Sequence, residues 1–337
     1  MKKATRKRVA RTTGAKATPK TTPKSAPRSA PKSYPPVPAE GPLIGAHMSV
    51  AGGPVTGIER ALAVRARALQ IFTKNANQWK GKPISDEEAT AFRAAWTASG
   101  LAPVVAHDSY LINLASPVGS LREQSVEALA DELLRCEVLG IAFLVAHPGA
   151  HVGSGVLEGC DRAAESIDEA RALAPAASVI LLLETVAGQG TTLGRKFEEL
   201  ARMRSGVARR DLVQFCFDTC HVHAAGYDLT TDQGYEETFR EFDAILGLES
   251  LRVFHVNDSK NERGSHVDRH EHIGKGKIGV EAFARLMRDP RFAAVPKLLE
   301  TPKGADGVVM DRRNLALLRR LAEEPQGGSD KRRRGVQ

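Results

Sequence analysis

The sequence predicts an α/β protein of the closed (β/α)8 barrel (TIM barrel) class, carrying a disordered basic tail at its N-terminus. Eight short apolar runs of strand length alternate with eight segments of helix length between residues 43 and 322. Six successive runs end in a residue that can bind a metal, in the order His, His, Glu, Asp, His and Glu. In a parallel barrel the chemistry lies at the C-terminal ends of the strands, so these endings would meet at one rim. A doubly wound open sheet would not bring six strand ends together, and no Gly-x-Gly-x-x-Gly motif follows the first strand.

The positive charge of the chain is concentrated at its two ends. The 337 residues carry a formal net charge of +8, of which residues 1–40 supply +10 and residues 330–337 supply +3, leaving −5 for the remainder. Residues 1–40 are rich in Lys, Arg, Pro, Ala, Ser and Thr, so they are predicted to be disordered and to attract the phosphate backbone of nucleic acid. The alternative is a tail that only aids solubility. We therefore expect a basic tail over 1–40, a barrel domain over 41–325 and a basic C-terminal tail over 326–337.

The composition also indicates which cellular compartment the protein occupies. No run approaches the roughly 18 apolar residues of a membrane span, and no apolar segment follows the basic N-terminus as it would in a secretory signal. The four cysteines fit neither a disulfide framework nor a Cys-x2-Cys zinc clip, so they are predicted to pack in the core of a protein kept in a reducing compartment. We expect a cytoplasmic protein that associates with the bacterial nucleoid, or a nuclear protein in a eukaryote, without a membrane partner.

The first two repeats show the alternation most clearly. Leu43–His47 is the first strand, and Gly52-Gly53 turns the chain into a helix. Ala68–Thr73 is the second strand, followed by a polar loop. Ser85 offers an N-cap, with an acidic first turn behind it, for a helix that ends at Gly100. The positions expected to be buried on the first helix are Ile58, Leu62 and Val64.

The remaining elements repeat the same pattern of a short apolar run followed by a helix. The expected strands are Pro103–Ala106, Ile141–Ala146, Val179–Leu183, Leu212–Phe217, Leu251–Phe254 and Val295–Leu299. The expected helices are Ser120–Leu139, Leu157–Leu173, Leu193–Met203, Tyr235–Leu246, Gly279–Met287 and Asp311–Ala322.

The sixth run illustrates why these strand endings indicate a metal. Residues 212–217 suit a buried strand, which stops at Asp218, and His221 and His223 follow at once, before Gly226 and Asp228 mark a loop. A carboxylate and an imidazole at the mouth of a buried strand cost free energy unless something binds them, and a metal ion is the usual reason. The alternative for any single ending is a loop of hydrogen-bonded histidines. The six endings are His107, His147, Glu184, Asp218, His255 and Glu300.

The segment 255–279 interrupts the barrel after the seventh strand and holds four of the ten histidines. Asp268 and His270 are two residues apart, so both side chains can point the same way from an extended loop. This spacing favours a further pair of metal ligands over a solvated polar loop.

Several longer motifs carry a resemblance to a known family. They are GAHMSVAGG (45–53), FTKNANQW (72–79), HDSYLINL (107–114), HPGAH (147–151), ETVAGQG (184–190), DTCHVHAAGYDL (218–229), HVNDSK (255–260), VDRH (267–270) and LETP (299–302). In this order and spacing, over about 41–302, the chain resembles the endonuclease IV family of abasic-site endonucleases.

That resemblance implies nine ligands for three metal ions, usually Zn2+, with Mn2+ as an alternative at some sites. Glu184 would bridge two ions, and through them it would be the catalytic residue. Five imidazoles and four carboxylates are also a donor set that suits zinc. The three ligand sets are His107, His147 and Glu184; Glu184, Asp218, His255 and Glu300; and His221, Asp268 and His270.

The resemblance also implies the reaction and the substrate. A hydroxide shared by the paired ions would hydrolyse the phosphodiester 5′ to an abasic site in double-stranded DNA, leaving a 3′-hydroxyl and a 5′-deoxyribose phosphate. Clearing of blocked 3′ ends is the expected second activity, and the protein is expected to be a monomer. Tyr110 and Leu111 match positions that insert into kinked DNA, and the loop of Asn77 is expected to touch DNA, although the family often has an arginine there.

Other positions depart from the family or carry no ligand role. Thr185 and Val186 replace a common Asn-Thr pair, so a contact behind Glu184 is expected to differ. His47 is expected inside the barrel near the site without being a ligand, and His223 and His272 have no assigned role.

Two alternatives come from other functional classes. A metal-dependent sugar isomerase or epimerase of the related barrel type also gathers His, Asp and Glu at strand ends, but it would not explain Asp268 and His270 as a third site. A non-catalytic DNA-compacting protein would act through its basic tails alone.

Overall fold

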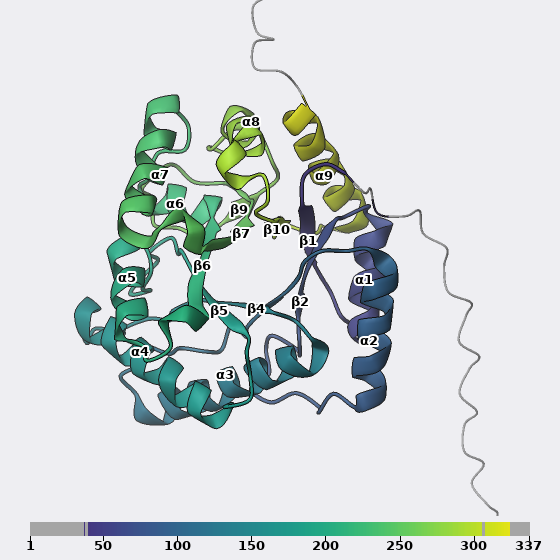
Figure 1. Cartoon of the computed structure of the whole chain (residues 1–337). Coiled ribbons are helices and arrows are strands. Elements are labelled where there is room, and N and C mark those ends of the chain that lie inside the picture. The colour runs from purple at the N-terminus through teal and green to yellow at the C-terminus, as the bar shows by residue number, and fades with distance from the viewer. Residues whose placement is uncertain (1–36, 38–39, 305–306, 324–337) are drawn as a thin grey trace, which may run out of the picture. The chain divides into compact units, whose positions relative to one another are not determined.

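The computed structural model describes residues 37, 40–304 and 307–323, and these form a closed barrel of eight parallel strands inside a ring of helices (Figure 1). The strand order around the barrel is β1-β10-β7-β6-β5-β4-β3-β2, and β1 closes the barrel by pairing with β10. The predicted fold class is therefore confirmed. The predicted tails, 1–40 and 326–337, fall outside the described residues apart from positions 37 and 40.

All eight barrel strands lie within two residues of their predicted edges. Each is short because it only has to cross the barrel wall before the chain turns into the next helix. The strands are β1 Ile44–Met48, β2 Ala68–Phe72, β3 Val104–His107, β4 Phe143–Ala146, β5 Ile180–Glu184, β6 Val213–Asp218, β7 Leu251–His255 and β10 Lys297–Leu299.

The helices cover the outside of the barrel and follow the predicted alternation. The predicted capping box is present at the start of α2, where the Ser85 hydroxyl accepts from the Glu88 N–H and the Glu88 carboxylate accepts from the Ser85 N–H. The helices are α1 Pro54–Ala63, α2 Asp86–Ser99, α3 Gly119–Leu139, α4 Val156–Leu173, α5 Phe197–Gly206, α6 Thr219–Ala225, α7 Asp232–Leu246, α8 Val280–Arg288 and α9 Gly307–Glu323. Short 3-10 turns lie at Arg210–Leu212, Leu248–Ser250 and Pro290–Phe292.

One predicted segment is wrong in detail, and one helix was not predicted. The helix expected from Leu193 begins only at Phe197, because Leu193 and Gly194 form backbone hydrogen bonds to Gly149 and Val186. The sequence did not predict helix α6, which follows Asp218 because the Asp218 carboxylate caps it by accepting from the His221 N–H at 2.8 Å. The loop predicted at Gly226 and Asp228 comes directly after this helix.

The long segment after β7 also contains structure that the sequence did not predict. Asp258–Ser259 (β8) pairs antiparallel with His270–Glu271 (β9), which returns the chain to the barrel rim. The Asp258 carboxylate accepts from the backbone N–H groups of Gly276 and Ile278, which ties the end of the segment to β8. This short hairpin therefore fixes where His270 lies.

Side chains inside the barrel form two layers. Because successive residues of a strand point to opposite faces, every second residue points inward. The lower layer, called here the inner apolar layer, consists of fully buried residues: Ala68, Val105, Val145, Leu182, Cys216, Val253 and Leu298. Two residues further along the chain from each of these, on the strand or directly after its end, is a polar side chain. These form what we call the polar ring: Gln70, His107, His147, Glu184, Asp218, His255 and Glu300.

The outward-facing residues of the strands pack against the helices and make up the main core. An aromatic cluster fills one side of it, with Phe217 stacked on Phe239 and in edge contact with Phe254. Among the described residues, no helix combines the length and apolarity that a membrane crossing requires. The inner apolar layer and this outer core together hold the strand ends in register.

Gly45 provides a direct test of the packing between β1 and β2. A Cβ built on Gly45 would lie 1.8 Å from the carbonyl oxygen of Ala68, its partner in β2, so the backbone would have to move. We expect Gly45→Ala to lower the free energy of unfolding by about 3 kcal/mol in a denaturant titration. Gly119→Ala is the control, because a Cβ there meets open space at the start of α3, and it should change stability by less than about 1 kcal/mol. Equal unfolding midpoints for the two variants would contradict this packing.

Candidate metal centre

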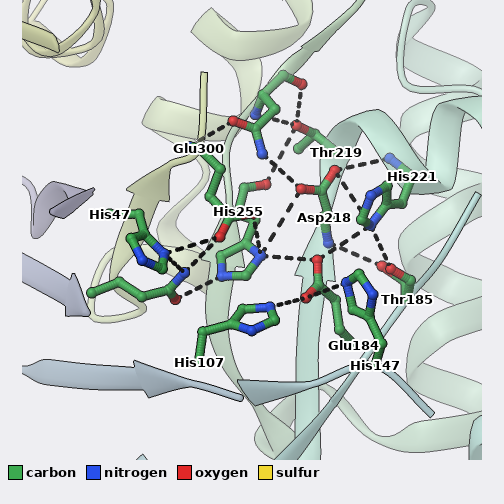
Figure 2. A network of polar contacts seen from close by, with 12 residues as sticks. His47, His107, His147, Glu184, Thr185, Asp218, Thr219, His221, His255 and Glu300 are labelled. Carbon is green, nitrogen blue, oxygen red and sulfur yellow. Dashed lines mark hydrogen bonds and ion pairs between the residues drawn. The ribbon is translucent and has the colours of Figure 1, made fainter. Parts of the chain in front are cut away.

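Glu184 lies at the middle of the polar ring and faces four histidines (Figure 2). Its Oε2 is 3.3 Å from His107 Nε2 and 3.2 Å from His147 Nε2, while its Oε1 is 2.9 Å from His255 Nδ1 and 3.2 Å from His221 Nδ1. Burial by itself raises the pKa of the Glu184 carboxyl, but the surrounding histidines, His255 first, hold it well below its usual range. Glu184 is therefore an ionised, fully buried carboxylate whose two oxygens face different histidine pairs.

The nine predicted ligands all lie at this rim. Among the described residues, donor atoms within 4.8 Å of one another form five overlapping groups, two of which include a cysteine: Glu184, Cys216 and His255; and Cys220, Asp268 and His270. The other three, called here the clusters, hold only histidines and carboxylates, and the first two have the membership predicted for the paired ions. In the third cluster Asp218 joins His221 and His270. Asp268 lies beside that cluster, with Oδ2 3.2 Å from His221 Nε2 and Oδ1 3.3 Å from His270 Nε2. The clusters are His107, His147 and Glu184; Glu184, Asp218, His255 and Glu300; and Asp218, His221 and His270.

Backbone carbonyls set the protonation of three histidines. A carbonyl oxygen only accepts, so a ring nitrogen hydrogen-bonded to it must carry the proton. The Nδ1–H groups of His107, His221 and His270 donate to the carbonyl oxygens of Asp108, Thr185 and Glu300, at 3.0, 2.8 and 3.2 Å. When these imidazoles are neutral, each Nε2 carries a lone pair that faces the carboxylates.

That arrangement of lone pairs and carboxylates is suited to binding a cation, and it is electrostatically unfavourable when no cation or proton is present. The Nε2 atoms of His221 and His270 are buried and have no hydrogen-bond partner, although both lie close to the Asp268 carboxylate. A lone pair held against a carboxylate is repulsive unless a proton or a metal ion lies between them. Imidazole nitrogens and carboxylate oxygens together are the donor set that zinc prefers, and the oxygen-rich second cluster also suits manganese.

Protons take the place of the cation in the metal-free protein. Burial lowers the pKa of His107 and His221, but close contacts with neighbouring carboxylates and the charges on them outweigh it and raise both pKa values well above the usual range. His255 shows the same balance, with Glu184 as its main opposing charge, and its pKa is raised. Partial burial raises the pKa of Asp268, but the close contact with His221 and the charges on His221 and His270 outweigh it and lower that pKa to about 2.

The residues predicted to touch DNA lie on loops at the same rim. Tyr110 is 64% exposed, and its ring packs edge-on against Phe72 at 5.3 Å between centroids. Leu111 is half-buried beside it, and Asn77 is exposed on the neighbouring loop. The Ser109 hydroxyl donates to the Ala76 carbonyl at 2.6 Å, so the two loops are tied together.

A buried ionic network anchors the loop that carries Asn77. The Lys74 ammonium lies 2.8 Å from Asp131 and 3.2 Å from Glu132, both on α3. The Arg135 guanidinium donates to the Thr73 carbonyl at 2.6 Å and to the Lys82 carbonyl at 2.9 Å. Both ends of the loop are therefore held by α3.

The histidines outside the predicted ligand set, and Thr185, have identifiable positions and contacts in the structure. His47 contacts Glu300, with Nδ1 to Oε1 at 3.4 Å, but it belongs to none of the clusters found among the described residues. His272 accepts from Asn314 away from the site, and His223 is buried on α6. Thr185, which departs from the family pattern, still makes a contact here, because its hydroxyl accepts from the Asp218 N–H at 2.9 Å.

Two residues of the site were missed at the level of sequence. Gln70 belongs to the polar ring but sits in the apolar run ALQIF, where a single glutamine gave no signal by residue type. Its position two residues after the inward-facing Ala68 would have revealed it. Asn257 donates to Asp218 Oδ2 at 2.7 Å and accepts from the Glu300 N–H at 2.8 Å, so it links the ends of β6 and β10.

Comparisons with known proteins bear on the family and the fold. A family model described as "Xylose isomerase-like TIM barrel" matches residues 58–321. The chain is similar to proteins named "Probable endonuclease 4" from Trichlorobacter lovleyi, at 52% identity over 82% of this chain and 99% of the relative, and from Chloroflexus aurantiacus, at 52% identity over 84% and 99%. Among solved structures, endonuclease IV from Thermus thermophilus is 39% identical with a TM-score of 0.75, covering 84% of this chain and all of that one. A D-tagatose 3-epimerase-like protein (17% identity, TM-score 0.60, covering 82% of this chain and 98% of that one) shares the fold.

The raised histidine pKa values predict that zinc binding releases protons. Because His107, His221 and His255 stay protonated above their usual pKa of roughly 6.5, zinc must displace those protons at pH 7. Apparent zinc affinity should therefore fall as the pH falls, by about tenfold per pH unit for each proton displaced. Calorimetric titrations in buffers of different ionisation enthalpy measure this release. A His272→Asn control, which lies outside the clusters, should release the same number, and zinc binding without proton release at pH 7 would contradict the assignment.

Proposed function

The chain belongs to the endonuclease IV family, and from that premise we propose that it is a DNA-repair enzyme that hydrolyses the phosphodiester 5′ to an abasic site. The products would be a 3′-hydroxyl and a 5′-deoxyribose phosphate, and blocked 3′ ends would be a second substrate. The observation that carries the proposal is the buried Glu184 carboxylate, which faces four histidines at the rim of the barrel.

Three divalent cations, zinc with manganese as an alternative at some sites, would be held by the nine predicted ligands. Bound ions supply Lewis-acid activation of water at neutral pH and positive charge for the phosphate. Glu184 would hold two of them together, because its two oxygens face different histidine pairs. The three sets of ligands would be His107, His147 and Glu184; Glu184, Asp218, His255 and Glu300; and His221, Asp268 and His270.

The chain's own residues shape the place for the damaged strand. A cavity of about 450 Å3 opens beside the clusters, between the loop of Tyr110, the loop of Gln189 and the segment of Asp268 and Arg269. Tyr110 is exposed at its edge, where a ring can enter the space left by a missing base. Unstacking costs a few kcal/mol and is least at a damaged position, so such a wedge favours abasic DNA over intact DNA.

The related sugar epimerases remain the alternative from another class, because they share the barrel at 17% identity. The third cluster, with Asp218, His221 and His270 next to Asp268, favours the nuclease, since one or two metal ions suffice for the isomerase chemistry. Turnover of a ketose or aldose by a protein that holds one metal and leaves abasic DNA intact would support the alternative.

Incision of a defined abasic duplex tests the proposal directly. The zinc-loaded protein should cut a labelled duplex 5′ to its single abasic site, spare the undamaged duplex, and stop on addition of a chelator. Glu184→Gln removes one charged oxygen from between the paired clusters, so we expect the initial rate to fall by more than about 100-fold. Glu237→Gln, the same change at an exposed position on α7, should cut at the wild-type rate. A near-wild-type rate for Glu184→Gln would contradict the proposal that Glu184 holds two cations together.

The basic tail should affect binding but not cleavage. We assign nuclease activity to residues 41–325, and we assign to 1–40, with a charge of +10, a salt-dependent attraction to phosphate. A chain lacking 1–40 should bind DNA several-fold more weakly at about 50 mM salt, with little difference at about 200 mM, and should nick saturating abasic duplex at the full-length rate. A full-length control with the same tail residues in scrambled order should bind as the wild type does. Loss of nicking with the truncated chain would favour a DNA-compacting protein that acts through its tails.

A further inference from the structure

We propose that Gln70 is a positioning residue for the metal centre, holding His255 and Glu300 in the orientation that binds the second cation. The inference rests on the proposed metal-dependent function. Gln70 lies on β2, which like β1 carries no predicted ligand, and its side chain belongs to the polar ring and is fully buried. It therefore cannot touch DNA, and any effect it has must pass through its neighbours.

The Gln70 amide makes three contacts. Its Nε2 donates to Glu300 Oε1 at 2.6 Å and to His47 Nδ1 at 2.9 Å, and its Oε1 accepts from His255 Nε2 at 2.8 Å. The opposite amide orientation would place Oε1 against the Glu300 carboxylate, where two acceptors repel each other. The carboxylate of Glu300 therefore fixes which end of the amide faces His255. Figure 2 shows His47, His255 and Glu300 together on one side of the site.

This orientation determines what His255 offers to a cation. Because Oε1 of Gln70 only accepts, the proton of neutral His255 lies on Nε2, and Nδ1 keeps its lone pair. That Nδ1 faces Glu184 Oε1 at 2.9 Å and Glu300 Oε2 at 3.2 Å, within the second cluster. The other oxygen of Glu300 is occupied by Gln70, so Oε2 is left for the cation.

His255 differs from three of the other candidate histidine ligands in the group that accepts its second ring N–H. His107, His221 and His270 donate their second ring N–H to backbone carbonyls. His255 donates to the side chain of Gln70. This support can therefore be removed by one substitution, which is not possible for a carbonyl.

Few other side chains satisfy both partners from this position. An apolar residue would leave the buried N–H of His255 without an acceptor and would free the Glu300 carboxylate to turn. A glutamate would accept from His255 but would place a second carboxylate against Glu300 Oε1. Only an amide of this length supplies an acceptor for one ligand and a donor for the other.

The test compares zinc-loaded wild-type protein with Gln70→Met, Gln70→Glu and Val105→Ala. Met keeps the length of the side chain and removes both hydrogen-bonding groups. Glu keeps the acceptor for His255 and loses the donor to Glu300. Val105→Ala is the matched control, because it removes buried volume from the inner apolar layer on the neighbouring strand β3, and the valine side chain makes no hydrogen bond to a predicted ligand. Three readouts are taken: the rate of zinc loss to a chelator, the visible spectrum of the Co2+-loaded protein, and kcat and KM on the abasic duplex.

Gln70→Met should lose one equivalent of zinc about 10- to 100-fold faster than the wild type, with a changed cobalt spectrum. Its kcat should fall by a similar factor while KM stays unchanged, since Gln70 is out of reach of DNA. Gln70→Glu should lie between the wild type and Gln70→Met. Val105→Ala should unfold at lower denaturant concentration but keep the wild-type zinc-loss rate and spectrum.

The outcomes separate this inference from the proposed function. If the wild-type protein binds no zinc or does not cut abasic DNA, the proposed function fails. If the wild type cuts while Gln70→Met retains zinc and the cobalt spectrum as the wild type does, the positioning role is overturned. Zinc loss from Val105→Ala as fast as from Gln70→Met would also overturn it, because the effect would then be general loosening of the barrel. Should Gln70→Met fail to fold, wild-type zinc retention by Gln70→Glu would be decisive against it.

Discussion

The structure depends on the compensation of charge around one buried carboxylate. Glu184 is fully buried and yet remains ionised, because His107, His147, His221 and His255 each place a ring nitrogen within 3.3 Å of it. An isolated carboxylate in such a place would become protonated, and an isolated imidazole would stay neutral. Together the carboxylates and imidazoles stabilise each other's charged forms, and a divalent cation can replace the protons that they share. The attraction between carboxylates and imidazoles therefore has two effects: it stabilises the buried charges in the fold, and it arranges their donor atoms around a place for a cation.

The parallel barrel brings these groups together through the alternation of its strands. A residue of the inner apolar layer and a residue of the polar ring are two positions apart on seven strands, as with Leu182 and Glu184 on β5. The lower layer packs without polar atoms, apart from the thiol of Cys216, and closes the barrel beneath the site. One strand thus contributes stability through one residue and chemistry through the next inward residue. This division explains why a highly charged site can sit directly above an apolar layer inside the barrel.

Supporting contacts link several of the candidate ligands to a neighbouring strand end. His221 on α6 donates to the carbonyl of Thr185, which directly follows Glu184, and His270 donates to the carbonyl of Glu300, itself in the polar ring. Asn257 joins Asp218 to the backbone of Glu300. A shift of one strand end would therefore turn the ligands carried by another. Rigid second contacts of this kind hold ligand orientation and tautomer together.

The sequence by itself determined the eight strands, the order of the polar endings and the capping box at Ser85, because these follow from residues close together in the chain. The alternation of inward and outward residues along a strand, and the residue types His, Asp and Glu, can be recognised without a structure. Only the tertiary structure showed Gln70 between His255 and Glu300, the hairpin of β8 and β9, and the place of Asp218 in the third cluster. Gln70 and His255 are 185 positions apart, and no local pattern records a hydrogen bond across the inside of a closed barrel. Local propensity fixes which face a side chain takes, whereas its partner depends on how distant strands come into register.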